Sequence, residues 1–200
     1  MEDTGDGFLN LPAATDGDPT LVWSEVFGDD QPVQIELGIG KGRFILDAAA
    51  RLPEVNFVGV EWAAKYLRIA HHRAGRRQLD NIRFARTDAR EFVEFFVPAA
   101  SVQAYHIYFP DPWPKKRHHK RRLFNEVFLR EVERTLETDG ELWLATDFAD
   151  YFEVMLEVLD TSSVLDEINV DWLGARTNYE DKYLALGKPI FRRVLKKSGL

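Results

Sequence analysis

From Val33 onward, short apolar runs alternate with segments that have the spacing of an amphipathic helix. Strands are predicted at residues 33–37, 56–61, 82–86, 104–109 and 140–146, and helices at 44–52, 63–78, 91–96, 123–138 and 151–159. Strand and helix in turn predict a mostly parallel sheet with right-handed crossovers and helices on both faces. Two further strands are predicted at 165–170 and 189–197 with no helix between them, so we expect a seven-stranded α/β fold that closes with an antiparallel pair.

The chain of 200 residues is long enough for one domain with a sizeable core. Residues 1–20 are rich in Gly, Pro, Asp and Thr and are predicted to be disordered, whereas residues 21–200 are predicted to form a single domain. No apolar run approaches the ~20 residues of a membrane span, and the N-terminus lacks a signal-peptide pattern, so we expect a cytoplasmic protein without a membrane partner. The chain has no cysteine and its five histidines show no zinc-like spacing, which predicts no disulfide and no metal.

Charge is unevenly distributed along the chain. The formal net charge is −7, but residues 1–40 contain nine acidic and no basic side chains, so residues 41–200 hold 26 basic against 24 acidic side chains. The basic residues cluster at 65–86 and at 115–122. Local clusters govern binding to polyanions more than the net charge does. The acidic total therefore does not exclude a nucleic-acid partner.

Residues 109–123 read Phe-Pro-Asp-Pro-Trp-Pro-Lys-Lys-Arg-His-His-Lys-Arg-Arg-Leu. Three prolines within five residues prevent the preceding buried strand from continuing and a helix from starting, so the chain leaves the sheet as a stiff loop. The loop carries one carboxylate, Asp111, and one large ring, Trp113, followed by six Lys and Arg residues and two histidines. So many like charges repel one another unless a polyanion lies across them. A solvated surface or a targeting signal requires no proline-rich loop joined to a buried strand, so the pattern predicts chemistry on a nucleic acid.

A glycine-rich turn, Glu36-Leu-Gly38-Ile-Gly40-Lys-Gly42, follows the first predicted strand. Glycines allow a tight turn here and a close approach of the backbone to a ligand, although a purely structural turn has the same pattern. Glu61 ends the second strand about twenty residues on, where an acid can bind both hydroxyls of a ribose. The spacing is not the G-x-G-x-x-G of dinucleotide binders, which favours an adenosine-type ligand without a pyrophosphate.

Acidic side chains fall at the ends of five predicted strands: Glu36, Glu61, Asp88, Asp111 and Asp147. The carboxyl ends of parallel strands meet at one edge of a sheet, so we expect these acids to line one cleft. Such a cleft suits a cation, for example the sulfonium of S-adenosylmethionine. Any one of them could instead cap a helix, and Asp88 precedes Glu91 in a capping-box-like arrangement.

Together these motifs resemble those of one enzyme family. Over residues 33–197 the chain resembles the tRNA (guanine-N7-)-methyltransferases of the bacterial TrmB type. The resemblance is carried by Glu-Leu-Gly-Ile-Gly-Lys-Gly-Arg-Phe at 36–44, Phe-Val-Gly-Val-Glu at 57–61, the 109–123 block, Ala-Thr-Asp at 145–147, and Thr-Asn-Tyr-Glu at 177–180 with Gly187 beyond. It implies a class I, Rossmann-like methyltransferase that uses S-adenosylmethionine to methylate N7 of guanine 46 in the variable loop of tRNA.

The resemblance also implies roles for individual residues. S-adenosylmethionine is expected to be held by Glu36, Gly38, Gly40, Glu61 and Asp88, with Asp111 at the methyl end of the cleft as the catalytic carboxylate. Contacts to the target nucleotide are expected from Lys115, Asp147, Thr177, Asn178, Tyr179 and Glu180. Contacts to the rest of the tRNA are expected from Arg117, His118, His119, Lys120, Arg121 and Arg122. The basic cluster at 65–86 is either an exposed helix face or a further tRNA contact, and monomer and homodimer both stay open.

The implied reaction suits these residue types. Guanine N7 has an in-plane lone pair, so no base has to remove a proton, and the protein must mainly place N7 in line with the methyl carbon. Asp111 is predicted to accept hydrogen bonds from the N1–H and N2–H edge of guanine or to stabilise the developing positive charge; the alternative is that it only shapes the turn. Trp113 or Tyr179 is predicted to stack on the target base, unless Trp113 is a core ring.

Three other functions stay open on the sequence alone. A methyltransferase for exocyclic amines would carry a D-P-P-[YF]-like motif, which residues 111–114 resemble only superficially. A non-catalytic RNA-binding module would explain the basic loop but not the glycines or the acids at the strand ends. A nicotinamide-dependent enzyme is disfavoured by the glycine spacing.

Overall fold

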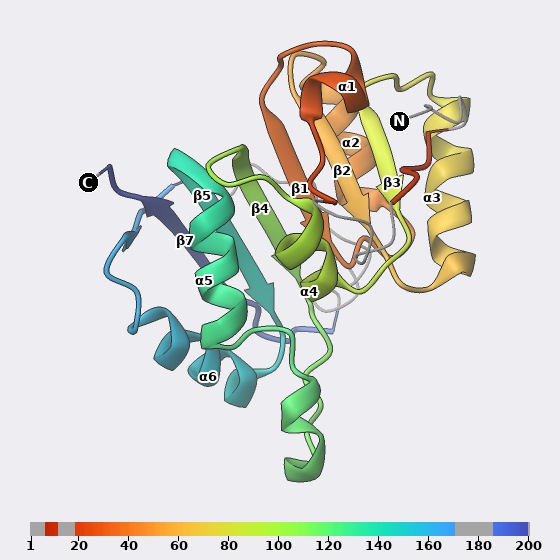
Figure 1. The fold of residues 1–200 in the computed structure, drawn as a ribbon. Coiled ribbons are helices and arrows are strands. Elements are labelled where there is room, and N and C mark those ends of the chain that lie inside the picture. The colour runs from red at the N-terminus through yellow and green to blue at the C-terminus, as the bar shows by residue number, and fades with distance from the viewer. Residues whose placement is uncertain (1–6, 12–18, 171–185, 200) are drawn as a thin grey trace.

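The computed structural model describes residues 7–11, 19–170 and 186–199. Within these ranges seven strands form one sheet in the order β3-β2-β1-β4-β5-β7-β6 (Figure 1). The strands are β1 (Val33–Leu37), β2 (Asn56–Val60), β3 (Ile82–Ala85), β4 (Val102–Tyr108), β5 (Leu136–Thr146), β6 (Leu165–Glu167) and β7 (Phe191–Lys197). The first five are mutually parallel, and β7 lies antiparallel to both β5 and β6. The predicted α/β fold with a closing antiparallel pair is confirmed.

Helices cover both faces of the sheet. They are α1 (Trp23–Phe27), α2 (Arg43–Arg51), α3 (Ala64–Arg76), α4 (Ala89–Glu91), the π-helix η1 (Phe92–Phe96), the 3₁₀ helix η2 (Lys116–Arg121), α5 (Glu126–Thr135) and α6 (Ala149–Leu159). Alternate side chains of the strands enter two separate cores: Phe57 packs with α2 and α3, whereas Val58 and Val60 pack with η1, α5 and α6. The helices on the two faces are therefore α2 and α3 on one, and η1, α5 and α6 on the other (Figure 1).

Helix boundaries differ from the predicted ones where a side chain caps the helix. The helix predicted at 123–138 begins at Glu126, because the Asn125 side chain accepts a hydrogen bond from the Phe128 N–H at 3.1 Å. It ends at Thr135, and the chain passes directly into β5 at Leu136. The strand predicted at 165–170 ends at Glu167. Helix α1 was not predicted, because five residues are too few to show a helical period.

Part of the N-terminal segment predicted to be disordered lies against the sheet. Gly7 O accepts from the Phe84 N–H at 2.9 Å, and the Leu9 N–H donates to Phe84 O at 2.8 Å. The Phe8 ring packs against His71 of α3 at 4.5 Å between centroids. Residues 7–11 thus pair with the edge strand β3, and the predicted disorder does not extend to them. No helix in the described ranges is both long and apolar enough to span a bilayer.

Candidate active site

The strand order brings the predicted site residues to one edge of the sheet. The order reverses between β1 and β4, so the crevice beyond their carboxyl ends is the usual ligand position in an α/β sheet. Glu36 is the second-to-last residue of β1 and pairs in register with His106 of β4. Glu61 and Asp147 directly follow β2 and β5, and Asp111 lies three residues beyond β4. All of them therefore belong to the same sheet edge.

The glycine-rich turn between β1 and α2 divides its glycines between two tasks. Gly38, Gly40 and Gly42 have φ of 82°, 52° and 73°, in the left-handed region that favours glycine. A Cβ on Gly42 would lie 2.8 Å from the Ala70 Cβ, so this glycine lets α2 and α3 approach each other. A Cβ on Gly38 or Gly40 would meet no heavy atom within 4 Å, which leaves that surface of the turn open to a ligand.

Glu61 holds the glycine-rich turn in place. Its Oε2 accepts from the Gly40 N–H at 2.8 Å, and its Oε1 accepts from the Ala63 N–H at 2.8 Å. The carboxylate thus ties the turn to the start of α3, a contact that sequence spacing does not reveal. Each oxygen keeps a further lone pair, so an oriented carboxylate of this kind can still accept hydrogen bonds from a diol.

Glu36 is a buried acid with an unsatisfied oxygen. The residue is 4% exposed, and Oε2 has no hydrogen-bond partner among the described residues. Burial raises the pKa of Glu36 to about 8; a backbone hydrogen bond from Ile45 lowers the pKa, and the nearby Glu61 raises it. Leaving a buried acceptor unpaired costs about 1–3 kcal/mol. A ligand with a cationic donor group would satisfy this oxygen and stabilise its charge.

Asp88 caps a helix, which was one of the two roles left open for it. Its Oδ1 accepts from the Arg90 N–H at 2.8 Å and from the Glu91 N–H at 3.4 Å, at the start of α4. Both bonds involve Oδ1, so the cap does not use Oδ2. The side chain is exposed at the same sheet edge as Glu61 and keeps one oxygen for another partner.

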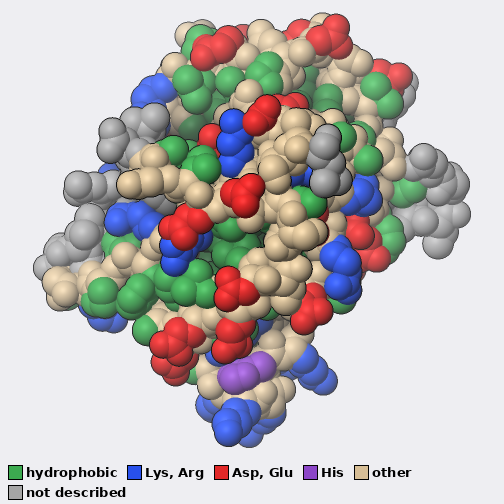
Figure 2. All heavy atoms as spheres, turned by 90° about the vertical axis from the view of Figure 1, so that its left-hand side faces the viewer, with side chains coloured by type: hydrophobic (Ala, Val, Ile, Leu, Met, Phe, Trp, Pro, Cys, Tyr) green, Lys and Arg blue, Asp and Glu red, His purple; other side chains and the backbone are tan. Residues whose placement is uncertain are grey.

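The basic loop, residues 115–122, projects from the body of the protein beyond the carboxyl end of β4 (Figure 1). Lys and Arg side chains and a histidine gather on this projection (Figure 2). Its lysines, Arg117, His119 and Arg121 are exposed, and no acidic side chain of the described residues forms an ion pair with them. His118 is half-buried and accepts from the Arg117 Nε–H at 3.2 Å. The loop therefore presents positive charge to solvent.

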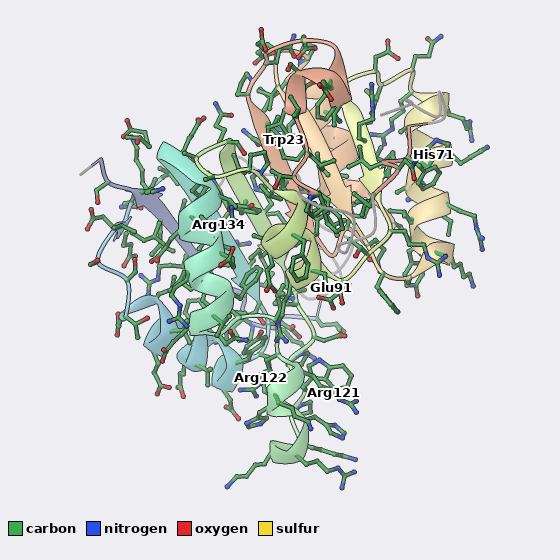
Figure 3. The ribbon with its side chains drawn as sticks, viewed as in Figure 1. Trp23, His71, Glu91, Arg121, Arg122 and Arg134 are labelled. Carbon is green, nitrogen blue, oxygen red and sulfur yellow. The ribbon has the colours of Figure 1, made fainter. Side chains whose placement is uncertain are left out.

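Arg122 does not fit the predicted RNA contact. It is 6% exposed, its Nε–H donates to Pro112 O at 2.8 Å, and its guanidinium lies 4.8 Å from the centre of the Tyr151 ring. The Arg90 guanidinium donates in turn to the Arg122 carbonyl. Arg122 thus ties Pro112, in the middle of the three prolines, to Tyr151 of α6. A buried guanidinium needs such partners within the fold. In Figure 3, Arg121 and Arg122 lie where the projection joins the body.

Trp113 packs within the basic loop and is not a core ring. Its side chain is half-buried, the Arg121 guanidinium lies 5.0 Å from its ring centre, and the His118 ring meets it edge-on at 5.7 Å. Its φ of 41° is in the left-handed region, as is the φ of 52° at Phe109. Two such residues in five turn the chain sharply away from β4, which places the exposed Asp111 between the sheet edge and the basic loop.

The remaining predicted site residues fall into two groups. Lys115 is exposed, and Asp147 is half-buried directly after Thr146, whose hydroxyl accepts from the Phe148 N–H at 3.2 Å. Thr177, Asn178, Tyr179 and Glu180 lie outside the described residues. Within the described ranges, no group of three or more His, Cys, Asp or Glu side chains is arranged to hold a metal ion.

The site also rests on residues that the sequence patterns did not reveal. Tyr151 of α6 lies under Arg122 and accepts from the Phe124 N–H at 3.0 Å. His106 of β4 is bonded to the Tyr108 hydroxyl through Nδ1 at 2.8 Å, and burial lowers its pKa to about 3. A histidine within an apolar strand is the one signal that could have indicated this buried contact.

Comparison with known proteins identifies the family. A family model described as "Putative methyltransferase" matches residues 30–193. A tRNA (guanine-N(7)-)-methyltransferase from Listeria monocytogenes serotype 4b is 42% identical over 177 residues, which cover 85% of this chain and 82% of the relative. One from Geobacillus thermodenitrificans is 38% identical with the same coverage. The chain belongs to the tRNA (guanine-N(7)-)-methyltransferase family.

Solved structures support the fold of this family member independently. The aminoglycoside resistance methyltransferase NpmB1 superposes with a TM-score of 0.59 at 19% identity, covering 83% of this chain and 87% of that one. An rRNA methylase from Streptococcus thermophilus gives 0.58 at 15% identity, covering 86% and 89%. At these identities the likeness shows the fold alone, and it confirms the predicted Rossmann-like methyltransferase architecture.

Proposed function

We propose that this protein transfers the methyl group of S-adenosylmethionine to N7 of a guanine in tRNA, at position 46 of the variable loop. The observation that carries the proposal is the position of the basic loop. The loop leaves the same sheet edge at which the glycine-rich turn, Glu36 and Glu61 meet, with Asp111 between them. Family membership supports both the methyl donor class and the RNA acceptor.

The residues at the sheet edge fit S-adenosylmethionine, whose sulfonium supplies an electrophilic methyl group. The open surface of Gly38 and Gly40 admits a ligand against the backbone. Glu61, already oriented by two backbone N–H groups, accepts hydrogen bonds from the ribose hydroxyls. The unsatisfied oxygen of Glu36 pairs with the ammonium of the amino-acid portion, and Asp88 offers its unused oxygen to the adenine amino group.

The acceptor side needs no base, because guanine N7 carries a free lone pair. Asp111 accepts hydrogen bonds from the N1–H and N2–H edge of guanine, which orients N7 and offsets the positive charge that methylation creates. Lys115 and Asp147 contact the same nucleotide, and Thr177–Glu180 complete this group outside the described residues. A stacked guanine has to swing out to reach this position.

The basic loop supplies the contacts to the tRNA backbone. Its exposed side chains, Arg117, His119, Lys120 and Arg121, bind phosphates, while Arg122 keeps the loop in position. Trp113 is covered on one side by Arg121. A target base that stacks on Trp113 therefore has to use the other face of the ring, unless Arg121 moves onto a phosphate.

The test is methyl transfer from labelled S-adenosylmethionine to unmodified tRNA, with borohydride and aniline cleavage to locate the product. We compare the wild type with Asp111→Ala and with Asp160→Ala, which removes an exposed acid at the C-terminal end of α6. We expect cleavage at one variable-loop guanine for the wild type. The rate of methyl transfer should be at least about 100-fold lower for Asp111→Ala and unchanged for Asp160→Ala. Near-normal transfer by Asp111→Ala would assign Asp111 to the turn alone. No transfer to any tRNA by the wild type would refute the proposed function.

A further inference from the structure

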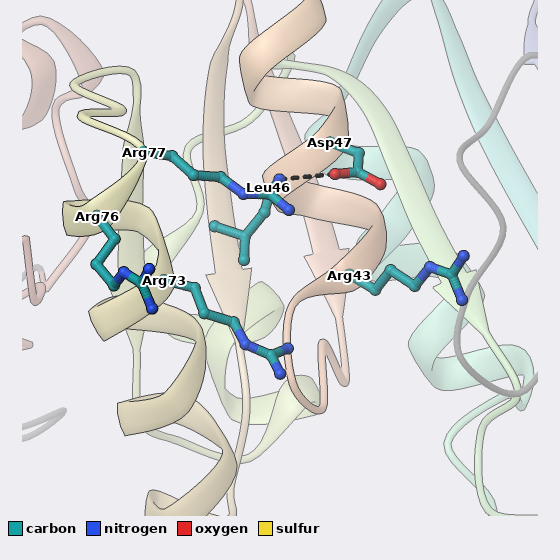
Figure 4. Close-up of a pocket in the computed structure, with 6 residues that line it drawn as sticks. All are labelled: Arg43, Leu46, Asp47, Arg73, Arg76 and Arg77. Atoms are coloured by element: carbon teal, nitrogen blue, oxygen red, sulfur yellow. Dashed lines mark hydrogen bonds and ion pairs between the residues drawn. The ribbon is translucent and has the colours of Figure 1, made fainter.

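A groove lined by arginines lies between α2 and α3, on the face of the sheet opposite α5 and α6 (Figure 4). Its volume is about 480 Å³. The lining side chains are Arg43, Leu46 and Asp47 from α2, and Arg73, Arg76 and Arg77 from the last turn of α3 and the residue after it. We call this the α2–α3 groove; the predicted catalytic and substrate-binding side chains do not line it.

The charges in the groove are poorly balanced. Asp47 is the one acid in the lining, and its Oδ1 pairs with the Arg77 Nη1 at 2.6 Å. Arg73 donates to the Lys41 carbonyl at 3.0 Å, a contact that orients the guanidinium but neutralises no charge. Neither Arg73 nor Arg76 forms an ion pair with an acidic side chain of the described residues. The groove therefore keeps an excess of positive charge.

The position of these arginines at the end of α3 does not by itself explain them. Basic residues in the last turn of a helix interact favourably with its dipole. Arg73, however, reaches across to the carbonyl of Lys41 in the glycine-rich turn, 32 residues away, and not to the end of its own helix. Arg77 likewise reaches Asp47 on α2. In Figure 4 the side chains of Arg73 and Arg77 extend from α3 toward α2, whereas the Arg43 guanidinium points away from α3, so the arginines of α3 border the space between the helices.

The chemistry of the lining selects an anion with several oxygens. A guanidinium presents N–H groups in a planar fork that matches the oxygens of a phosphate. The groove is a hollow on the outer surface between two helices, so it suits an extended phosphodiester chain. Leu46 contributes the single apolar side chain of the lining, which offers no enclosed surface to a nucleobase.

The location of the groove relative to the candidate active site indicates which molecule supplies that phosphate. Arg43 follows Gly42 directly, so the groove begins where the glycine-rich turn ends. The basic loop leaves the neighbouring strand β4 at the same sheet edge. An RNA whose guanine enters the cleft at this edge therefore has one basic surface on each side of it.

We propose that the α2–α3 groove binds backbone phosphates of the tRNA substrate, on the side of the cleft away from the basic loop, chiefly through Arg73 and Arg76. This inference rests on the proposed function, because it assigns a second contact surface to the same tRNA. It accounts for the middle of the basic cluster at 65–86, where Arg73 and Arg76 lie, as an RNA contact.

The test uses Arg76, because it is exposed and its removal breaks no hydrogen bond or ion pair of the described residues. Affinity for unmodified tRNA is measured against salt concentration for the wild type, Arg76→Ala and Arg76→Glu. The matched control is Arg130→Glu, which makes the same charge change on α5, on the opposite face of the sheet. Losing one phosphate contact should lower the slope of log K against log salt by about 0.7–0.9 and the affinity roughly three- to tenfold. The control should leave both unchanged.

Additional measurements separate this inference from the proposed function and from a small-anion site. Binding of S-adenosylhomocysteine and the transfer rate at saturating tRNA should be unchanged in Arg76→Ala. If the wild type methylates tRNA while both Arg76 variants bind it with the wild-type slope, the groove does not contact RNA. An equal loss of tRNA affinity in Arg130→Glu would show that the effect comes from net charge alone, and it would overturn the proposal. Tight binding of inorganic phosphate or adenosine monophosphate that depends on Arg76, with tRNA affinity unchanged, would make the groove a site for small anions instead. A wild type that neither binds nor methylates tRNA would instead contradict the proposed function.

Discussion

Replacing Glu36 by glutamine should stabilise the protein without its cofactor, by an amount that grows with pH. The native pKa of Glu36 is about 8 and the unperturbed value is 4.5. Between these pH values the native state holds one proton more than the unfolded state, so the free energy of unfolding falls as pH rises. The slope is about 1.4 kcal/mol per pH unit, and the whole window is worth about 5 kcal/mol as an upper bound.

The glutamine variant removes this titration and keeps the shape of the side chain. Its amide oxygen can still accept the Ile45 N–H that now donates to Glu36. At pH 7 the variant should exceed the wild type by about 3 kcal/mol in free energy of unfolding, and at pH 5 by less than about 1 kcal/mol. Urea-induced unfolding at pH 5, 6, 7 and 8 measures the difference. Glu153→Gln, at an exposed position of α6, is the control and should show no such trend.

A cationic ligand beside Glu36 should cause this side chain to lose its proton. Because the positive charge stabilises the carboxylate, binding of S-adenosylhomocysteine at pH 7 should release about one proton in the wild type and none in Glu36→Gln. Titration calorimetry in buffers of different ionisation enthalpy measures that number. Parallel pH profiles for wild type and Glu36→Gln, together with no proton release, would show that water or another group already satisfies the buried oxygen, and the reasoning from burial would fail.

Three further outcomes follow from contacts in the structure. Arg122→Ala should lower the free energy of unfolding by about 3 kcal/mol, because the fold loses a buried guanidinium with its carbonyl and ring partners. Arg121→Ala should change the free energy of unfolding by less than about 0.5 kcal/mol and should instead flatten the salt dependence of tRNA binding. Equal effects of the two substitutions on stability would contradict the anchor role of Arg122. Gly42→Ala should cost about 2 kcal/mol of stability through its φ of 73° and its crowded neighbour, whereas Gly40→Ala should cost about 1 kcal/mol and mainly weaken cofactor binding, as unfolding and calorimetry can compare. Burial lowers the pKa of His106 to about 3, so its neutral form contributes stability above pH 6.5 that is lost as pH falls; acid unfolding of His106→Gln should lack that slope of about 1.4 kcal/mol per unit.

The predictions that held depend on short-range patterns. The alternation of apolar runs with helical spacing is repeated five times, and it correctly predicted the parallel strands and the closing antiparallel pair. The three prolines after β4 correctly placed the exit of the chain from the sheet. Both features act through the backbone of neighbouring residues, so a linear pattern contains them.

The errors lie where the fold chooses between equivalent residues. Arg121 and Arg122 are identical in a linear pattern, but one faces solvent and the other is buried against Tyr151, 29 residues further along. Asp88 is not one of these errors: the start of α4 confirms that it caps a helix, which the sequence had left open, and its contact with the cofactor stays a prediction. The short helix α1 and the pairing of residues 7–11 with β3 left no periodic signal.

The sequence by itself determined the fold class, the glycine-rich turn, the acids at the strand ends and the proline-rich basic loop, because each depends on residue types a few positions apart. Tertiary structure decided which of these groups share a contact. It joined Glu61 to Gly40, buried Glu36 with one oxygen unsatisfied, and assembled the α2–α3 groove from arginines on two helices. The physical reason is that burial and hydrogen bonding depend on distances in space. These distances are fixed only when the strands have paired in the folded sheet, so the order of residues along the chain does not contain them.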